Sequence, residues 1–178
     1  MSQKILINHR EIHIILHRLA CQLIENHDDF SNTVLVGMQP RGVFLAEKII
    51  RILKNDFQIK HIEYGQLDIT FYRDDFRRRE EPLQASQTNM NVNVENKKVV
   101  FIDDVLFSGR SIRAALTAIQ SFGRPNAIEL LVLIDRRFSR NLPIQPDYKG
   151  IQVDAINAEK VKVDWNKNKD TVYLVKND

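Results

Sequence analysis

Three short, continuous apolar runs constrain the fold of this chain more than any other feature. They are Thr33 to Gly37, Val99 to Ile102 and, apart from Glu129 near its start, Ala127 to Ile134, and the first two are followed by turns that contain glycine. Uninterrupted apolar runs of this length are typical of strands buried on both faces, as in parallel sheets. Helical patterns follow the first two runs, so the chain predicts strand–helix–strand units with right-handed crossovers.

Helical patterns occupy the positions that such a fold requires. Asn8 and Glu11 have the spacing of a capping box, which predicts that a helix begins there. Apolar residues recur at helical spacing at residues 12–23, 43–53 and 114–122. Further strands are predicted at residues 67–72, 159–164 and 171–175. The sequence therefore predicts a single α/β domain over residues 1–178, built on a mainly parallel twisted sheet flanked by helices.

Composition excludes several classes of protein. The chain has 178 residues, 43% of them hydrophobic and 28% charged, as in globular domains that fold around one core. No apolar run is long enough for a membrane span, and residues 1–13 lack the apolar core of a secretory signal. Cys21 is the single cysteine, so a reducing cytoplasm is the expected location. The net charge of +3 is too small to indicate nucleic-acid binding by itself.

The segment from Val99 to Ser111 contains the residues best suited to chemistry. Four apolar residues lead to the adjacent acids Asp103 and Asp104, and a turn with Ser108 and Gly109 then opens a helix. Free N–H groups and the dipole at a helix N-terminus suit a phosphate, which glycine lets the backbone approach closely. Two carboxylates beside such a site suit a sugar phosphate, because its vicinal hydroxyls donate hydrogen bonds to the acids.

Two alternatives share part of this pattern. Paired aspartates can end a strand in any α/β protein, and a Walker B acid or a phospho-acceptor aspartate looks the same locally. A P-loop nucleoside triphosphatase also needs a Walker A loop. Gly37 and Gly42 have its glycine spacing, but Val43 and Phe44 stand where lysine and serine or threonine are required. The combination of buried strand, acid pair and glycine–serine turn therefore favours a sugar-phosphate site.

The same segment resembles the PRPP-binding signature of type I phosphoribosyltransferases: an apolar strand, two aspartates, then a hydroxyl-and-glycine turn. Further motifs narrow the resemblance to the PyrR family, bifunctional uracil phosphoribosyltransferases that also regulate pyrimidine genes by binding RNA. These motifs occur, in order, at residues 35–42, 68–75, 103–110, 123–125, 133–136, 142–144, 147–148 and 159–161. The resemblance covers nearly the whole chain. It implies a flexible loop over about residues 73–98 and a small hood over about residues 135–165.

The resemblance implies a role for each matching position. Asp103 and Asp104 correspond to the catalytic acids that hydrogen-bond the ribose 2′ and 3′ hydroxyls of PRPP. The 5′-phosphate of PRPP is expected at Val105, Leu106, Phe107, Ser108, Gly109, Arg110 and Ser111. The pyrophosphate is expected at Pro40, Arg41 and Gly42, together with Arg73 from the flexible loop. Uracil is expected in the hood, at Arg136 and the backbone near Val161.

The reaction that the resemblance implies is the transfer of a phosphoribosyl group from PRPP to uracil, through an oxocarbenium-like transition state. Mg²⁺ is the expected cofactor, held mainly by PRPP oxygens and water, with no dedicated protein ligands. Closure of the loop is expected to exclude water and so to suppress hydrolysis of PRPP. The expected partners are PRPP, uracil or UMP, pyrophosphate and an mRNA leader, with no membrane. The expected assembly is a homodimer or a larger homo-oligomer.

Several positions depart from the family pattern. The family usually has glycine after Asp-Arg in the hood, where Arg137 stands here, and one extra residue precedes Leu142. On the first helix, His17 and Cys21 stand where the family has threonine and histidine, and Gln145 replaces a common arginine. Two alternatives therefore stay open. One is an RNA-binding attenuator with weak or no enzyme activity, and the other is a phosphoribosyltransferase for another base, a purine or orotate.

Two further groups of charged residues are given a structural interpretation. His9, His13 and His17 recur every four residues and line one side of the first helix, where no carboxylate or thiol completes an obvious metal site. They are interpreted as a solvated or interfacial face. The arginines at residues 77–79 lie in a run of mixed charge, which is typical of solvated surface.

Overall fold

A parallel five-stranded sheet is the centre of the molecule. The computed structural model describes residues 2–74, 87–155, 159–166 and 169–176. In this part of the chain, adjacent strands of the sheet follow the order β3-β2-β4-β5-β6, and every pair is parallel. The strands are β2 (Thr33–Met38), β3 (Glu63–Leu67), β4 (Lys98–Leu106), β5 (Ala127–Arg136) and β6 (Tyr148–Val153). The predicted mainly parallel sheet is confirmed.

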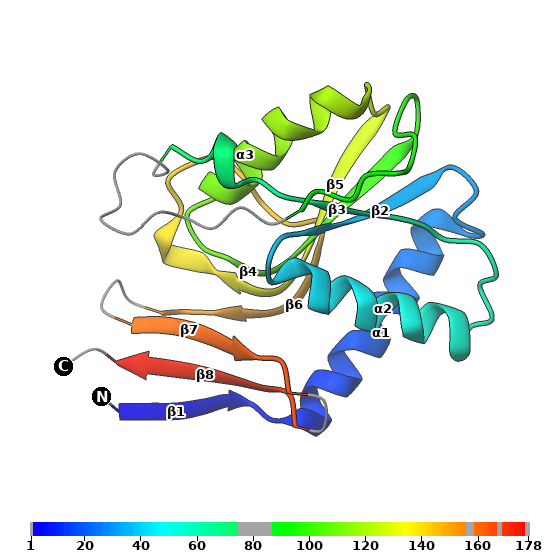
Figure 1. Cartoon of the computed structure of the whole chain (residues 1–178). Coiled ribbons are helices and arrows are strands. Elements are labelled where there is room, and N and C mark those ends of the chain that lie inside the picture. The colour runs from blue at the N-terminus through cyan, green and yellow to red at the C-terminus, as the bar shows by residue number, and fades with distance from the viewer. Residues whose placement is uncertain (1, 75–86, 156–158, 167–168, 177–178) are drawn as a thin grey trace.

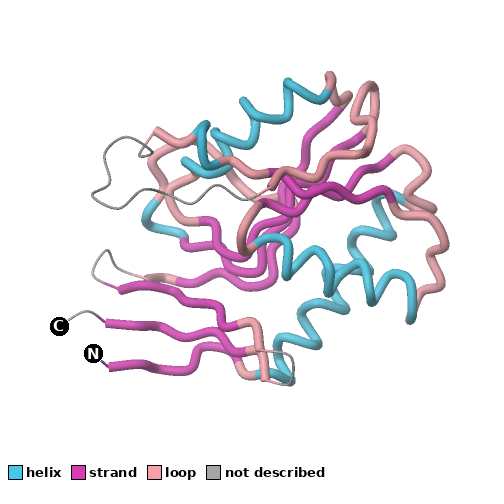
Figure 2. The backbone as a smooth tube through the Cα atoms, in the orientation of Figure 1, coloured by secondary structure: helices cyan, strands magenta, loops and turns pink. Residues whose placement is uncertain are grey.

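Helices cover both faces of this sheet (Figures 1 and 2). The helices are α1 (His9–His27), α2 (Gly42–Asn55) and α3 (Arg110–Ile119). Successive residues of β4 show the division of the core. Val100 and Ile102 pack with α1 and α2 in one cluster, whereas Val99 and Phe101 pack with α3 in another. Because side chains alternate along a strand, the continuous apolar run of β4 serves both layers. In the described part of the chain, no helix has the length and apolar character needed to cross a membrane.

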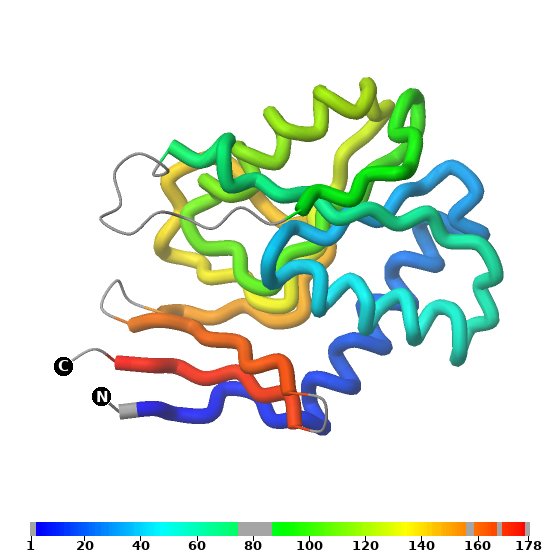
Figure 3. Tube along the Cα trace, viewed as in Figure 1, coloured from blue at the N-terminus to red at the C-terminus, as the bar shows by residue number. Residues whose placement is uncertain are grey.

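A second, antiparallel sheet brings the two ends of the chain together. Its strands are β1 (Ser2–Ile7), β7 (Glu159–Asp164) and β8 (Thr171–Lys176), in the order β1-β8-β7. Figure 3 shows the first and last strands, blue and red, running side by side. The predicted strands at residues 159–164 and 171–175 are confirmed, and the sequence analysis missed β1, which pairs with β8.

Of two local predictions, the capping box is confirmed and the strand at residues 67–72 is wrong. The capping box of α1 is confirmed, since the Asn8 side chain accepts from the Glu11 N–H and the Glu11 side chain accepts from the Asn8 N–H. The predicted strand at residues 67–72 is wrong, because β3 ends at Leu67. The side chain of Asp68 accepts hydrogen bonds from the backbone N–H and the hydroxyl of Thr70, at 2.9 and 2.6 Å, and a short 3₁₀ helix, η1 (Thr70–Tyr72), follows. This local turn competes with the strand for backbone groups.

Strand β6 was also missed by the sequence analysis. It lies within residues 135–165 and completes the parallel sheet beside β5. Two further 3₁₀ helices, η2 (Gln120–Phe122) and η3 (Arg137–Ser139), follow α3 and β5.

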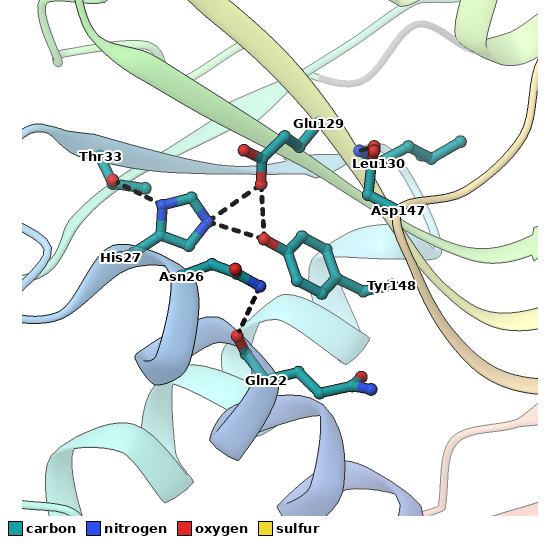
Figure 4. Close-up of polar contacts among 8 residues, drawn as sticks. All are labelled: Gln22, Asn26, His27, Thr33, Glu129, Leu130, Asp147 and Tyr148. Atoms are coloured by element: carbon teal, nitrogen blue, oxygen red, sulfur yellow. Dashed lines mark hydrogen bonds and ion pairs between the residues drawn. The ribbon is translucent and has the colours of Figure 1, made fainter.

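A buried polar network ties α1 to the sheet at the amino end of the strands (Figure 4). Nδ1 of His27 lies 3.0 Å from the hydroxyl of Thr33, and Nε2 lies 3.1 Å from a carboxylate oxygen of Glu129. The Tyr148 hydroxyl lies 3.1 Å from Nε2 and donates to the same Glu129 oxygen at 2.6 Å. Glu129 can only accept, so the arrangement assigns the ring proton to Nε2 and makes the Thr33 hydroxyl the donor to Nδ1. The network therefore joins α1, β2, β5 and β6 through one neutral imidazole.

Candidate active site

The carboxyl ends of β2, β4 and β5 meet at one edge of the sheet, where ligands bind in open α/β folds. Strand β4 delivers Asp103 and Asp104 to this edge directly after four fully buried apolar residues. Asp104 is buried, and its backbone N–H donates to a carboxylate oxygen of Asp103 at 2.9 Å. The two acids are therefore held next to each other by the rigid strand and by their own backbone.

Burial makes both acids harder to ionise. Desolvation raises the pKa of Asp103 well above its usual range, and the neighbouring Asp104 carboxylate raises it further. Desolvation also raises the pKa of Asp104, against the opposing effect of the Arg41 guanidinium. Nη1 of Arg41 lies 3.5 Å from an Asp104 oxygen. The acids are thus placed to gain from a ligand that brings hydrogen-bond donors or positive charge.

The loop after β4 has the geometry of a phosphate site. Gly109 takes a left-handed conformation with φ of 89°, immediately before the first turn of α3. A Cβ atom at this position would also lie 3.2 Å from the Ile144 side chain, so glycine is required for both conformation and space. The following residues present the N-terminus of α3, where backbone N–H groups and the helix dipole attract an anion.

A cavity of about 320 Å³ opens above this loop. Its size falls in the range of small-molecule sites. It is lined by Arg73, Asp103, Val105, Leu106, Phe107, Ser108, Gly109, Arg110, Ser111, Ile112 and Asn141. Nine of these residues belong to the site predicted from the sequence, and the fold brings them around one space. Ile112 and Asn141 were missed, because nothing in their local sequence marks them as neighbours of the loop.

The turn after β2 forms the neighbouring wall. The Gln39–Pro40 peptide bond is cis, and Arg41 extends from the turn to Asp104. Gly42 begins α2 so close to β4 that an added Cβ would lie 2.1 Å from the carbonyl oxygen of Ile102. Any larger residue would push the turn away from the acid pair. The three residues predicted to bind pyrophosphate therefore lie beside the two acids.

The start of the predicted hood is tied to the glycine loop. The Arg140 guanidinium donates to the Phe107 carbonyl at 2.5 Å and to the carboxylate of Asp135. The Arg136 guanidinium stacks over the Phe107 ring at 4.1 Å and donates to the Glu159 carbonyl at 3.0 Å. Arg136 thus contacts Phe107, which lines the cavity, but does not line the cavity itself. The contribution of Arg140 was missed, because its two partners lie on different segments.

Other predicted residues lie elsewhere. Val161 is in β7, pairs with Leu174 and packs against the apolar core rather than lining the cavity. Residues 75–86 of the predicted flexible loop, including the arginines at residues 77–79, lie outside the described residues, as does Ala158 of the hood. Before that gap, Asp74 accepts from the guanidinium groups of Arg110 and Arg113, each at 2.7 Å. Within the described part, no group of three or more His, Cys, Asp or Glu side chains could hold a metal ion.

Comparison with known proteins assigns the chain to a family. The model of the phosphoribosyl transferase domain matches residues 2–167. A protein named Bifunctional protein PyrR from Chloroflexus aurantiacus is 43% identical over 162 residues, which cover 91% of this chain and 88% of the relative. Another of the same name from Synechocystis is 40% identical and covers 96% of both chains.

Solved structures agree on the fold. A hypoxanthine phosphoribosyltransferase from Staphylococcus aureus superposes with a TM-score of 0.65 at 21% identity, covering 86% of this chain and 80% of that one. At this identity, the likeness concerns the α/β architecture alone.

Proposed function

We propose that this chain, which belongs to the phosphoribosyl transferase family and within it to the bifunctional PyrR proteins, transfers the 5-phosphoribosyl group of PRPP to uracil, giving UMP and pyrophosphate. The observation that supports it best is the placement of two adjacent acids beside a glycine loop at the N-terminus of α3. Asp104 is buried, and the partly exposed Asp103 lines the cavity. This pairing offers acceptors for a ribose diol and donors for its 5′-phosphate within one cavity.

The residues that line the cavity, and the acids and turn beside it, each have a proposed role. Asp103 and Asp104 accept hydrogen bonds from the ribose hydroxyls, and their charge lies beside the positive charge that develops on the ribose ring. The loop from Val105 to Ser111 holds the 5′-phosphate. Pro40, Arg41 and Gly42 face the leaving pyrophosphate, together with Arg73. The protein thus positions two reactants and stabilises separated charge.

The residues present fit the magnesium ion that this reaction requires. Asp103 and Asp104 are hard oxygen donors, and burial leaves their ionised forms in need of positive charge. Mg²⁺ commonly uses one or two carboxylates together with substrate phosphates and water, rather than a cage of protein ligands. When bound with PRPP, the ion would neutralise the departing pyrophosphate.

Arg136 and the backbone of the hood are proposed to read the base. Arg136 is buried, stacks on Phe107 and contacts β7 through the Glu159 carbonyl, so it links the glycine loop to the second sheet. Arg137 and the extra residue before Leu142 lie in the same segment and depart from the family pattern. The choice of base is therefore the first property to measure.

The direct test is to incubate the full chain with PRPP, Mg²⁺ and one base at a time, and to measure pyrophosphate release. Uracil is expected to support turnover, whereas hypoxanthine, guanine and orotate are not. Asp104→Asn is the matched variant of low activity, and Asp164→Asn, at an exposed acid at the end of β7, is the control that should retain activity. Turnover with a purine or orotate and none with uracil would change the assigned base. No turnover with any base would leave regulation as the main role.

A second candidate function, regulation through an mRNA leader, is supported by family membership and by a basic groove of about 560 Å³ beside the hood. Arg137, Arg140 and Lys149 line this groove. The two arginines are already engaged, Arg137 with Asp154 at 2.6 Å and Arg140 with Asp135. We therefore propose that RNA binding by this chain is weak.

A further inference from the structure

A groove between α1 and α2, separate from the candidate active site, is not used by the proposed function. It has a volume of about 210 Å³. Ile12, Leu16 and Ile52 form its apolar floor, and each of them is at least nine-tenths buried. Asp170, directly before β8, lies at one end of the groove, with its Oδ2 3.9 Å from Nδ1 of His9 in the first turn of α1. The helices therefore leave a hollow at a point where two apolar faces would otherwise close on each other.

Basic side chains surround this floor. His9 and His13 extend from α1, and Lys48 and Arg51 extend from α2. Lys48 is paired with Asp170, the one acid that lines the groove, at 2.8 Å. Among the residues that the structure describes, Arg51 forms no ion pair. The groove is thus lined by an unneutralised guanidinium and by the His13 imidazole. Together these two side chains can donate two or more hydrogen bonds to an anion.

The opposite end of the groove is acidic, because Asp170 lies there. The Asp170 side chain is only 5% exposed. Its Oδ2 accepts from Lys48 and lies 3.9 Å from Nδ1 of His9, while Oδ1 has no hydrogen-bond partner among the described residues. A buried acceptor without a donor is costly and favours a ligand that brings hydroxyl groups to this end. The same carboxylate repels a second anionic group.

We infer that this groove binds a sugar phosphate. The phosphate lies at Arg51 and His13, the hydroxyls lie toward Asp170 and Lys48, and the carbon face of the sugar rests on the apolar floor. The volume lies below the roughly 300 Å³ at which drug-sized sites begin, so a single phosphorylated pentose fits better than a nucleotide. This inference does not depend on the proposed function, since none of these residues lines the candidate active site.

The test is titration of the ¹⁵N- and ¹³C-labelled chain with ribose 5-phosphate, followed by NMR. His13 and Ile52 report on the groove, and the Gly109 amide reports on the glycine loop, where a phosphate is also expected to bind. Separate titrations with ribose and with inorganic phosphate distinguish the two ends of the ligand. We expect saturable shifts at His13 and Ile52 with ribose 5-phosphate, and weaker binding of either half alone.

Substitution then assigns the contact. Arg51→Gln and His13→Gln each lower the affinity at the groove at least about tenfold, because the glutamine amide has neither the charged fork of the guanidinium nor the ring N–H of the imidazole. Lys54→Gln, an exposed position one turn further along α2, leaves the affinity unchanged and is the matched control. All three positions are exposed, and thermal unfolding confirms that each variant is folded. Shifts confined to Gly109, or equal affinity in Arg51→Gln and the unsubstituted chain, would overturn the inference.

Discussion

The two edges of the parallel sheet solve the problem of buried polar groups in opposite ways. At the amino edge, His27 is enclosed by Thr33, Glu129 and Tyr148, and both of its ring nitrogens have partners. At the carboxyl edge, Asp103 and Asp104 are held side by side, and the ion pair to them from the described residues is a 3.5 Å contact between Arg41 and Asp104. The first arrangement is complete without a ligand, whereas the second is completed by one. The amino edge therefore contributes stability, and the carboxyl edge contributes binding.

The same difference predicts opposite responses to pH. Burial lowers the pKa of His27, so its contribution to stability is present above the unfolded value of about 6.5 and is lost as pH falls toward the folded value. Burial raises the pKa of Asp103 and Asp104, so stability is greatest where both are protonated and falls as pH rises above about 4. One sheet thus has an edge that favours higher pH and an edge that favours lower pH.

The largest expected effect is at the amino edge. His27→Ala leaves the Thr33 and Tyr148 hydroxyls and the Glu129 carboxylate without their shared partner and creates a cavity. We expect the free energy of unfolding to fall by about 3 kcal/mol, measured by chemical denaturation at pH 7.5. His61→Ala, at an exposed histidine, is the control and should change stability by less than about 0.5 kcal/mol. Equal stability of the two variants would mean that the network is not what joins α1 to the sheet.

At the carboxyl edge, the expected loss is in turnover. Asp103→Asn and Asp104→Asn should each lower kcat/KM for PRPP by at least about tenfold, or about 1.4 kcal/mol of transition-state stabilisation. The reason is that, in the proposed function, these carboxylates accept hydrogen bonds from the ribose diol and lie beside the charge that develops there. Steady-state pyrophosphate release is the measurement. Kinetics near those of the unsubstituted chain in both variants would remove the ribose assignment.

The pH dependence of the melting temperature compares the two edges of the sheet without reference to catalysis. For the unsubstituted chain, the melting temperature should fall as pH drops below about 6.5, and His27→Gln should weaken this dependence. Asp103→Asn should instead weaken the loss of stability on the alkaline side of about pH 4. Scanning calorimetry across this range separates the two contributions. If His27→Gln changed the pH dependence assigned to Asp103, or Asp103→Asn changed the one assigned to His27, the separate contributions of the two edges would be contradicted.

The smallest expected effect concerns RNA. Arg18, which could replace the family's missing arginine contact, donates instead to the Lys149 and Gly150 carbonyls. With Gln145 in place of an arginine, binding to a pyrimidine-operon leader should be weak. The slope of log affinity against log salt concentration should be smaller by about one unit than with the arginine present. Titration at two salt concentrations, with and without UMP and against an unrelated hairpin, is the measurement. Tight, UMP-strengthened preference for the leader would make regulation a principal role.

The carboxyl edge could be predicted from the sequence, but the amino edge could not. A strand, an acid pair and a glycine turn are local patterns, so the segment from Val99 to Ser111 indicated its own structure. The His27 network joins residues 102 and 121 positions apart, and no local pattern links them. For the same reason, the sequence did not indicate that Arg140 would reach Phe107.

Strand predictions failed where tertiary contacts override periodicity. In β6, buried Tyr148 and Gly150 are followed by partly exposed residues, and this weak pattern does not indicate a strand of the central sheet. At residues 67–72, the alternating pattern suggested a strand, but the turn at Asp68 and Thr70 ends β3 first. Local hydrogen bonding to a side chain outweighed the hydrophobic alternation there.

The central claim is that Asp103 and Asp104 serve ligand binding and lower the stability of the unliganded protein. One measurement tests it directly. Thermal unfolding of the unsubstituted chain and of Asp103→Asn is compared at pH 7, each with and without PRPP and Mg²⁺. Without ligand, Asp103→Asn should be the more stable protein, because it removes a buried carboxylate whose ionisation is opposed by Asp104. PRPP should then raise the melting temperature of the unsubstituted chain more than that of the variant. A variant that is less stable without ligand, and equally stabilised by PRPP, would contradict the claim.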